Sequence, residues 1–204
     1  LKKQRECIYK DICYDKFPNK NSILMFADKH HGFKDDSGNK YDVWDLIEEG
    51  YYSMESLPND WMNRKNNQIQ RDCAITHKPF YDVAKIRSGI NELVYPIYHL
   101  DFESFPCPLP RFKGERSYMQ SLFQFSLHIE REPGVCDKEK DHYEFLAYNH
   151  DDTREELVKK LCEYIEDDNG SVLVYNQAFE KTRIKELAQF FPEYSDQLHR
   201  INSR

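Results

Sequence analysis

Residues 95–103 carry the clearest hydrophobic pattern in the chain and predict a strand that ends in two acids. The apolar side chains at positions 98, 100 and 102 share one face by the two-residue period of a strand, whereas Asp101 and Glu103 share the other. Residues two apart lie roughly 6.5–7 Å from each other along a strand. The two carboxylates therefore converge on one small volume. The motif alone leaves two interpretations open: a divalent-cation site, or two surface acids that each pair with a Lys or Arg.

The following 70 or so residues add three more strand patterns. Residues 121–130 alternate, and the alternation places Leu122 on the polar face and Phe123 on the apolar face. Residues 142–148 are expected to complete an antiparallel meander with the first two strands. The continuous apolar run at 171–176 predicts a short strand that is buried on both faces.

Helical spacing of apolar residues predicts the remaining elements. Two helices are expected in the C-terminal half, over residues 151–165 and 177–191, and Pro192 ends the second. Three are expected in the N-terminal half, and they cover residues 42–50, 59–75 and 82–93. The sequence therefore predicts an α/β (α+β) fold with a mixed sheet over residues 94–204, a small mostly helical region over 21–93, and a tether over 1–20.

Composition narrows the class of protein. The 204 residues suit one or two domains, and no apolar run approaches the roughly 18–20 residues of a membrane span. The net charge is −7, and all of it falls in residues 94–204, which hold 14 basic and 21 acidic residues. This balance argues against a duplex binder that relies on a broad basic surface. Six scattered cysteines without a hydrophobic leader predict a cytoplasmic protein with reduced thiols.

The ends of the chain suggest a fragment of a longer protein. The sequence begins at Leu1 without a Met, and it stops at Arg204 directly after a helical pattern. Cys7 and Cys13 are too few to complete a zinc or iron–sulfur site, which needs four ligands. Two interpretations stay open: free cysteines on a tether, or the last two ligands of an upstream iron–sulfur cluster in a longer chain.

Residues 104–118 are expected to form a loop, because three prolines and a glycine interrupt regular structure. Arg111 and Lys113 alternate there with Phe112 and Tyr118. Cations and exposed aromatic rings together suit the phosphates and bases of a single-stranded nucleic acid. A solvated loop with buried aromatic side chains explains the same residues equally well.

Three motifs together resemble the ribonuclease H-like fold of the DnaQ-like DEDD 3′–5′ exonucleases. They are Leu100-Asp-Phe-Glu-Ser104, Phe123-Gln-Phe-Ser-Leu-His128 and Tyr175-Asn-Gln-Ala-Phe-Glu-Lys181. The match is closer still to a bacterial domain-of-unknown-function family that resembles these exonucleases. In longer members this family can follow a Cas4-like nuclease region that bears an iron–sulfur cluster. The resemblance covers roughly residues 20–204.

The resemblance implies hydrolysis of phosphodiester bonds in DNA or RNA, at single-stranded ends, with two Mg²⁺ or Mn²⁺ ions per site. It assigns the metal-binding and catalytic roles to Asp101, Glu103 and Glu180. Glu180 stands where the exonucleases usually have Asp. The side chains expected to bind the nucleic acid are Arg111, Lys113, Gln124 and Asn176, although Asn176 also suits a plain helix N-cap.

One part of the exonuclease pattern is missing from the sequence. The family's last Asp, on a later helix, has no counterpart before Arg204, so we expect this fragment to be weak or inactive. Tyr164 and Asp168 have the right letters but precede Glu180, and we interpret them as coincidence. The alternative function is therefore a catalytically inactive, nuclease-like docking module beside another nuclease, such as an upstream nuclease region of the same chain.

Overall fold

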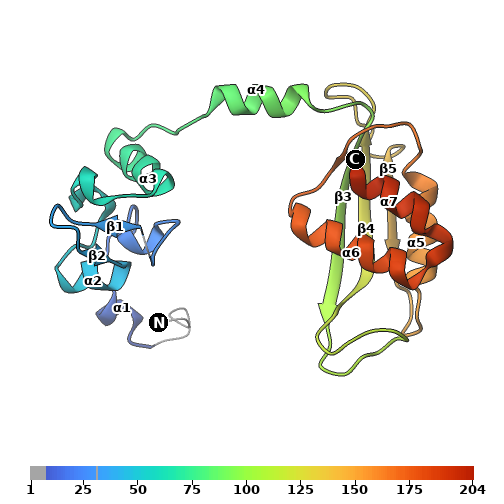
Figure 1. The fold of residues 1–204 in the computed structure, drawn as a ribbon, viewed down its shortest axis with the longest axis horizontal. Coiled ribbons are helices and arrows are strands. Elements are labelled where there is room, and N and C mark those ends of the chain that lie inside the picture. Colours follow the sequence, from blue (N-terminus) through green and yellow to red (C-terminus); the bar gives the residue numbers. More distant parts are fainter. Residues whose placement is uncertain (1–7, 31) are drawn as a thin grey trace. The chain divides into compact units, whose positions relative to one another are not determined.

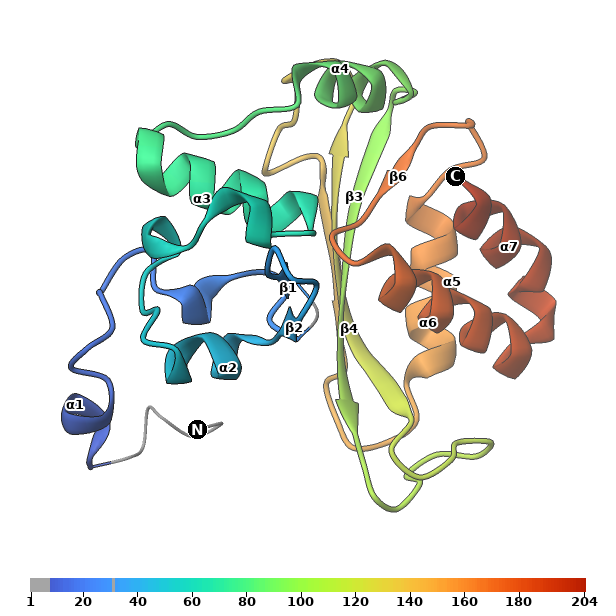
Figure 2. The ribbon, with the colours of Figure 1, turned by 60° about the vertical axis from the view of Figure 1, so that its left-hand side comes forward.

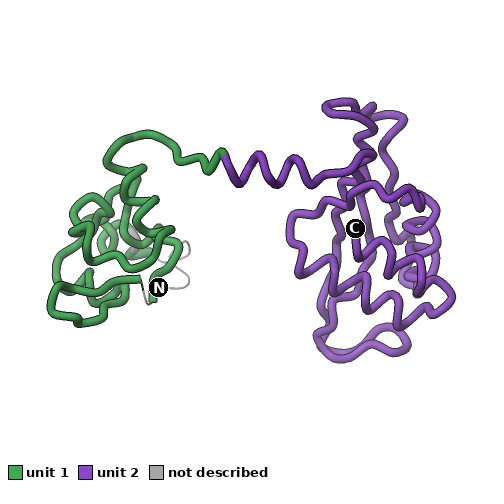
Figure 3. The backbone as a smooth tube through the Cα atoms, turned by 45° about the horizontal axis from the view of Figure 1, so that its top comes forward, with its two compact units in different colours: residues 1–83 green, residues 84–204 purple. Residues whose placement is uncertain are grey.

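The computed structural model describes residues 8–30 and 32–204, which divide into two compact units. One unit spans Leu1–Val83 and the other Ala84–Arg204 (Figure 3). Each unit has its own cluster of buried hydrophobic side chains. The two units are therefore described separately.

The first unit is built from short elements (Figure 1). Its elements are α1 (Lys10–Cys13), η2 (Ile23–Met25), β1 (Phe33–Lys34), β2 (Lys40–Tyr41), α2 (Val43–Glu48), η3 (Met54–Ser56), η4 (Asn59–Trp61) and α3 (Lys65–Thr76). Helix α2 begins where the sequence predicts, because Asp42 accepts hydrogen bonds from the backbone N–H groups of Trp44 and Asp45. It ends before Gly50, whose φ of 90° only glycine adopts without strain.

The single helix expected over residues 59–75 is wrong. The structure has the short turn η4 and then α3, and an extended Met62 separates them. Met62 forms an isolated antiparallel bridge with Phe33, and its side chain is buried in the core of this unit. Burial of Met62 therefore overrides the local helical pattern.

The second unit contains a four-stranded mixed sheet. Its strands are β3 (Ile97–Pro106), β4 (Gln120–Glu130), β5 (His142–Leu146) and β6 (Val172–Leu173), in the order β5-β4-β3-β6. The first three pair antiparallel, as the predicted meander requires, and β6 runs parallel to β3. The mixed α/β class is thus confirmed.

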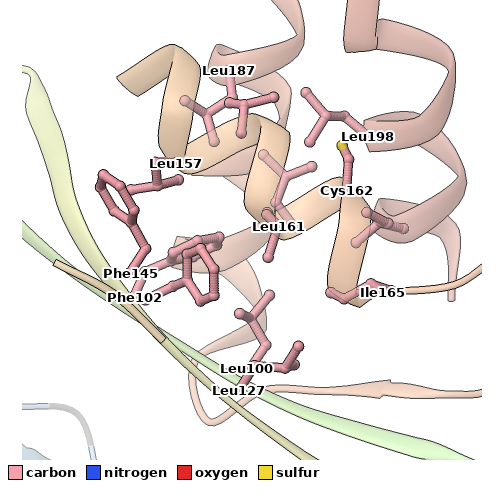
Figure 4. Close-up of a cluster of buried hydrophobic side chains, with 14 of the residues drawn as sticks. Leu100, Phe102, Leu127, Phe145, Leu157, Leu161, Cys162, Ile165, Leu187 and Leu198 are labelled. Atoms are coloured by element: carbon pink, nitrogen blue, oxygen red, sulfur yellow. The ribbon is translucent and has the colours of Figure 1, made fainter. Parts of the chain in front are cut away.

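Three helices cover one face of this sheet (Figure 2). They are α5 (Arg154–Tyr164), α6 (Gln177–Phe190) and α7 (Ser195–Ser203), and the turn η5 (Pro192–Tyr194) joins the last two. Figure 4 shows Phe102 and Phe145 of the sheet meeting Leu157 and Leu161 of α5 in the core. Helix α4 (Val83–Asn91) leads into β3. No helix in the described part of the chain is long and apolar enough to cross a membrane.

A β-bulge reverses the predicted faces of Leu122 and Phe123 in β4. The pairing shifts between Glu103 and Ser104, so that Glu103 lies opposite Gln124 but Ser104 lies opposite Leu122. Phe123 is therefore the extra residue of the bulge. Leu122 is buried in the core, and Phe123 is only half-buried, which is the reverse of the alternation read from the sequence. Strand β3 also continues through Pro106, where a loop was expected from Ser104.

The prediction of a doubly buried strand at 171–176 is also wrong. Strand β6 comprises only two residues, Leu173 is 42% exposed and Tyr175 is fully exposed. The reason is its position in the sheet: β6 pairs with β3 on one side, and no strand among the described residues pairs with its other side. Apolar composition alone does not distinguish an edge strand from a central one.

Arg154 fixes the loop between β3 and β4. Its side chain is 5% exposed, and Nη1 lies 3.3 Å from Oε1 of Glu115, whose side chain is 4% exposed. Nη2 lies 2.7 Å from Oδ2 of Asp152 and donates a hydrogen bond to the carbonyl oxygen of Lys113. The guanidinium also packs over the rings of Phe112 and Phe190. The loop is therefore held to the start of α5 and the end of α6.

We expect Arg154→Met to destabilise the second unit by about 3–5 kcal/mol, because it leaves the carboxylate of Glu115 buried without its cation. Both tryptophans, Trp44 and Trp61, lie in the first unit. Urea unfolding followed by far-ultraviolet circular dichroism should shift to lower urea, whereas the tryptophan fluorescence transition should not move. Arg200→Met is the control, since the Arg200–Asp167 pair is exposed and should contribute less than about 1 kcal/mol. Equal effects of the two substitutions would contradict this role of Arg154.

Candidate functional site

Strand β3 places the two predicted acids on the open face of the sheet. Its buried residues Tyr98, Leu100 and Phe102 face the helices, and Asp101 and Glu103 are exposed between them. In β4, Ser126 lies opposite Asp101 and Gln124 lies opposite Glu103. The alternation predicted from the sequence is thus present in the structure at these positions.

Glu180 is in the first turn of α6, and its side chain is buried. The helix begins after Asn176, whose side-chain oxygen accepts a hydrogen bond from the backbone N–H of Phe179 at 3.4 Å. Asn176 is therefore an N-cap. The Glu180 residue is 3% exposed, and its Oε2 atom has no hydrogen-bond partner among the residues that the structure describes. Burial raises the pKa of Glu180, and the charge of Asp101 raises it further.

The sheet topology explains why Asp101 and Glu180 are neighbours. Strands β3 and β6 are parallel and adjacent, with Tyr98 opposite Val172 and His99 opposite Leu173. Strand β6 ends at Leu173, opposite His99, so the chain that follows it leaves the sheet beside the middle of β3. Asp101 is the fifth residue of β3, two positions beyond His99, and the chain after β6 turns into α6, which carries Glu180 in its first turn. The carboxyl end of a strand in an α/β sheet, here that of β6, is a common position for ligand-binding residues.

Two of the three predicted metal ligands are thus brought within electrostatic range of each other. Among residues 8–30 and 32–204, no group of three or more His, Cys, Asp or Glu side chains is arranged to hold a metal ion. Mg²⁺, however, is usually bound by one or two carboxylates and completes its shell with water and substrate phosphates. The unpartnered Oε2 of Glu180 beside Asp101 fits that kind of site. Glu103 lies one step further along the same face of β3.

A cavity of about 670 Å³ opens beside Asp101. Its lining residues come from β3, β4 and the segment around β6, and they are His99, Leu100, Asp101, Ser126, His128, Leu173, Val174 and Tyr175. The exposed ring of Tyr175 thus borders the same cavity as the Asp101 carboxylate. This volume is large enough for a small organic ligand.

A family model described as a domain of unknown function (DUF2779) matches residues 98–204, slightly more than half of the chain. The chain belongs to this family. No curated protein and no solved structure matches the sequence. The DUF2779 domain begins at Tyr98 on β3 and so includes Asp101, Glu103 and Glu180.

A row of three histidines crosses the open face of the DUF2779 domain and was not foreseen from the sequence. His99 lies opposite His128, and His128 lies opposite His142, on three adjacent strands. The rings of His128 and His142 are 4.4 Å apart between centroids, and Nε2 of His99 lies 2.9 Å from Oε2 of Glu130. Burial lowers the pKa of His128, and the neighbouring His142 and His99 lower it further. Only the strand register, which the sequence does not specify, brings these residues together.

The remaining residues predicted to bind nucleic acid are distributed over two regions. Gln124 is on β4 opposite Glu103, close to the acids. Arg111 instead lies over the rings of Phe105 and Phe112, in the loop beyond the end of β3. Lys113 is exposed in the same loop, and its backbone carbonyl accepts the hydrogen bond from Arg154. The structure therefore does not bring Arg111 into the cavity beside Asp101.

The structure also shows the surroundings of Asp168 and of Cys13, two residues singled out in the sequence. Asp168 accepts a 2.7 Å hydrogen bond from the hydroxyl of Tyr98 and lies 2.6 Å from Nη2 of Arg204. Burial and this neighbour raise the pKa of Tyr98 to about 12. Asp168 is therefore engaged in a structural network with Tyr98 and Arg204. Of the two N-terminal cysteines, Cys7 lies outside the described residues, and Cys13 is an exposed free thiol.

We expect Glu180→Gln to stabilise the protein at neutral pH. Because the folded state raises the pKa of Glu180, ionisation of this carboxyl opposes folding once the pH exceeds the ordinary value of about 4.3. In the absence of divalent cations, the substitution should raise Tm by a few degrees at pH 7 and have no effect below about pH 4. The exposed Glu163 on α5 provides the control, Glu163→Gln. A lower Tm for Glu180→Gln at pH 7 would contradict the assignment.

Proposed function

We propose that the DUF2779 domain of this chain is a divalent-cation-dependent nuclease domain of the ribonuclease H-like, DnaQ-like type. Its substrate is the phosphodiester backbone of a single-stranded DNA or RNA end. The single observation that carries this proposal is the buried Glu180 carboxylate, which has an unpartnered oxygen in the described structure and whose pKa is raised by burial and by the charge of Asp101. A bound cation would favour the ionised form of this buried carboxylate, which burial and the charge of Asp101 otherwise disfavour.

The element order gives further support. Three antiparallel strands, a helix, a parallel strand beside the first and another helix match the order read from the sequence for the start of such a fold. The Asp-x-Glu motif is on β3, and the Asn-x-x-x-Glu motif spans the junction of β6 and α6. The motifs that carry the resemblance are therefore adjacent in space as well as similar in sequence.

The chain's own residues would have three roles. Asp101 and Glu180 would bind the cation directly. Glu103 would either be a further direct ligand or contact the cation through a bound water. Asn176 fixes the first turn of α6 and so positions Glu180. The cation, when bound, would polarise the phosphodiester and lower the pKa of an attacking water. Solvent enters through the cavity that Asp101 borders.

The direct test is calorimetric titration of the chain with Mn²⁺. We expect binding to the unmodified protein, and we expect Asp101→Ala and Glu180→Gln each to weaken it on the order of tenfold or more, because each removes a charged ligand. Glu163→Gln should bind as the unmodified chain does. If both Asp101→Ala and Glu180→Gln bind Mn²⁺ as tightly as the unmodified chain does, this site is excluded.

Hydrolysis is tested separately on 5′-labelled single strands with Mn²⁺ or Mg²⁺. The proposal predicts stepwise shortening from the 3′ end, abolished by Asp101→Ala. Because the resemblance implies a further acidic ligand, we expect this chain to cleave slowly. Cation binding without any cleavage would instead favour the nuclease-like docking module.

A further inference from the structure

A second cavity, of about 360 Å³, lies where the end of β3 meets the loop before β4 and the start of α5. Its walls are mainly apolar and include Phe105, Phe112 and Phe123, all three half-buried. The rings of Phe105 and Phe123 are 5.8 Å apart between centroids and tilted by 38°. A cavity of this size, with aromatic walls and a few polar groups, is typical of a site for a flat organic group.

The β-bulge accounts for the exposed aromatic surface. Because Phe123 is the extra residue of β4, it leaves the core face, and Leu122 takes its place there. On β3, alternation puts Phe105 on the same face as Asp101 and Glu103. Phe105 is four residues beyond Asp101, so the two Cα atoms are roughly 13 Å apart along the strand. The cavity therefore lies at the end of the sheet: Phe105 comes from the face that carries the acids, whereas Leu122 and Thr153 come from the core face of β4 and the start of α5.

The cavity is also lined by Arg111, whose guanidinium has no carboxylate partner among the residues that the structure describes. The guanidinium of Arg111 lies over Phe105 at 5.1 Å and over Phe112 at 5.3 Å from the ring centroids. Within the described chain, Arg111 contacts an acid only through its backbone N–H, which donates to Glu115. The acid at the rim, Asp151, already accepts a hydrogen bond from the side-chain amide of Asn149 at 2.8 Å. The charge of Arg111 thus remains available to an anion.

We propose that this cavity binds a nucleobase of a single-stranded nucleic acid, with Arg111 on the adjoining phosphate. The choice of ligand rests on the proposed function, because it assumes that the strand also passes the acids on β3. The phenyl rings provide stacking surfaces, which accept any base, and the guanidinium provides the charge complement to the backbone. Thr153 also lines the cavity, and its hydroxyl can hydrogen-bond with the edge of the base.

The assignment is tested by the fluorescence anisotropy of a 5′-labelled oligothymidylate with the whole 204-residue chain. EDTA and low salt are used, so that neither hydrolysis nor the cation site contributes. The comparison ligand is an abasic strand of the same length, which carries the same phosphates. We expect the oligothymidylate to bind about tenfold more tightly than the abasic strand.

Two substitutions separate the role of the ring from that of the charge, and only the first should remove this difference. Phe105→Ala should weaken oligothymidylate binding about tenfold and leave abasic binding unchanged, whereas Arg111→Gln should weaken both ligands. Phe80→Ala and Arg87→Gln, exposed residues outside the DUF2779 domain, are the matched controls and should have no effect. If Phe105→Ala lowers Tm, Phe105→Leu keeps a large apolar side chain but removes the aromatic ring, and it should show the same loss.

The outcomes separate this proposal from the proposed function. Asp101→Ala should still bind the oligothymidylate more tightly than the abasic strand, because the cavity does not depend on the cation site. If the unmodified chain fails to bind Mn²⁺, the nuclease site is overturned and the cavity assignment stands. Equal affinity for the two strands, or unchanged binding by a folded Phe105 variant, overturns the cavity assignment alone. Failure of both strands to bind also overturns it and leaves a hydrophobic peptide side chain as the better occupant.

Discussion

Strand β3 must satisfy two environments at once, and the rest of the second unit depends on how it does so. Leu100 and Phe102 pack against the helices, so the alternation of the strand forces Asp101 and Glu103 to the open face. A shift of one residue would bury both carboxylates and expose the core side chains. The pairing of β3 with β4 on one side and β6 on the other fixes this register.

The same constraint explains the site. Because β6 is parallel to β3 and ends opposite His99, the chain that follows β6 leaves the sheet two positions before Asp101 along β3 and then forms α6. Glu180, in the first turn of α6, is buried, and its Oε2 has no hydrogen-bond partner in the described structure. This environment is unfavourable for a charged carboxylate. The protein tolerates a group that opposes folding at neutral pH, and such groups are concentrated at functional sites.

The sequence was sufficient to predict the antiparallel meander, the helices α5 and α6 and the alternate faces at Asp101, because local hydrophobic periodicity determines them. It was not sufficient for the bulge at Phe123 or for the exposure of Leu173, because both depend on the neighbouring strand. The row formed by His99, His128 and His142 depends on register in the same way. The proximity of Glu180 to Asp101 was implied by a family resemblance, and no local pattern indicated it.

The central claim is that Asp101 and Glu180 share one divalent cation. Crystals of the chain grown with Mn²⁺ and measured near the manganese absorption edge test it most directly. The account predicts an anomalous peak within about 2.0–2.3 Å of oxygen atoms from both carboxylates, and its loss in Asp101→Ala. A fully occupied anomalous peak elsewhere, or no peak beside these two carboxylates, would contradict it.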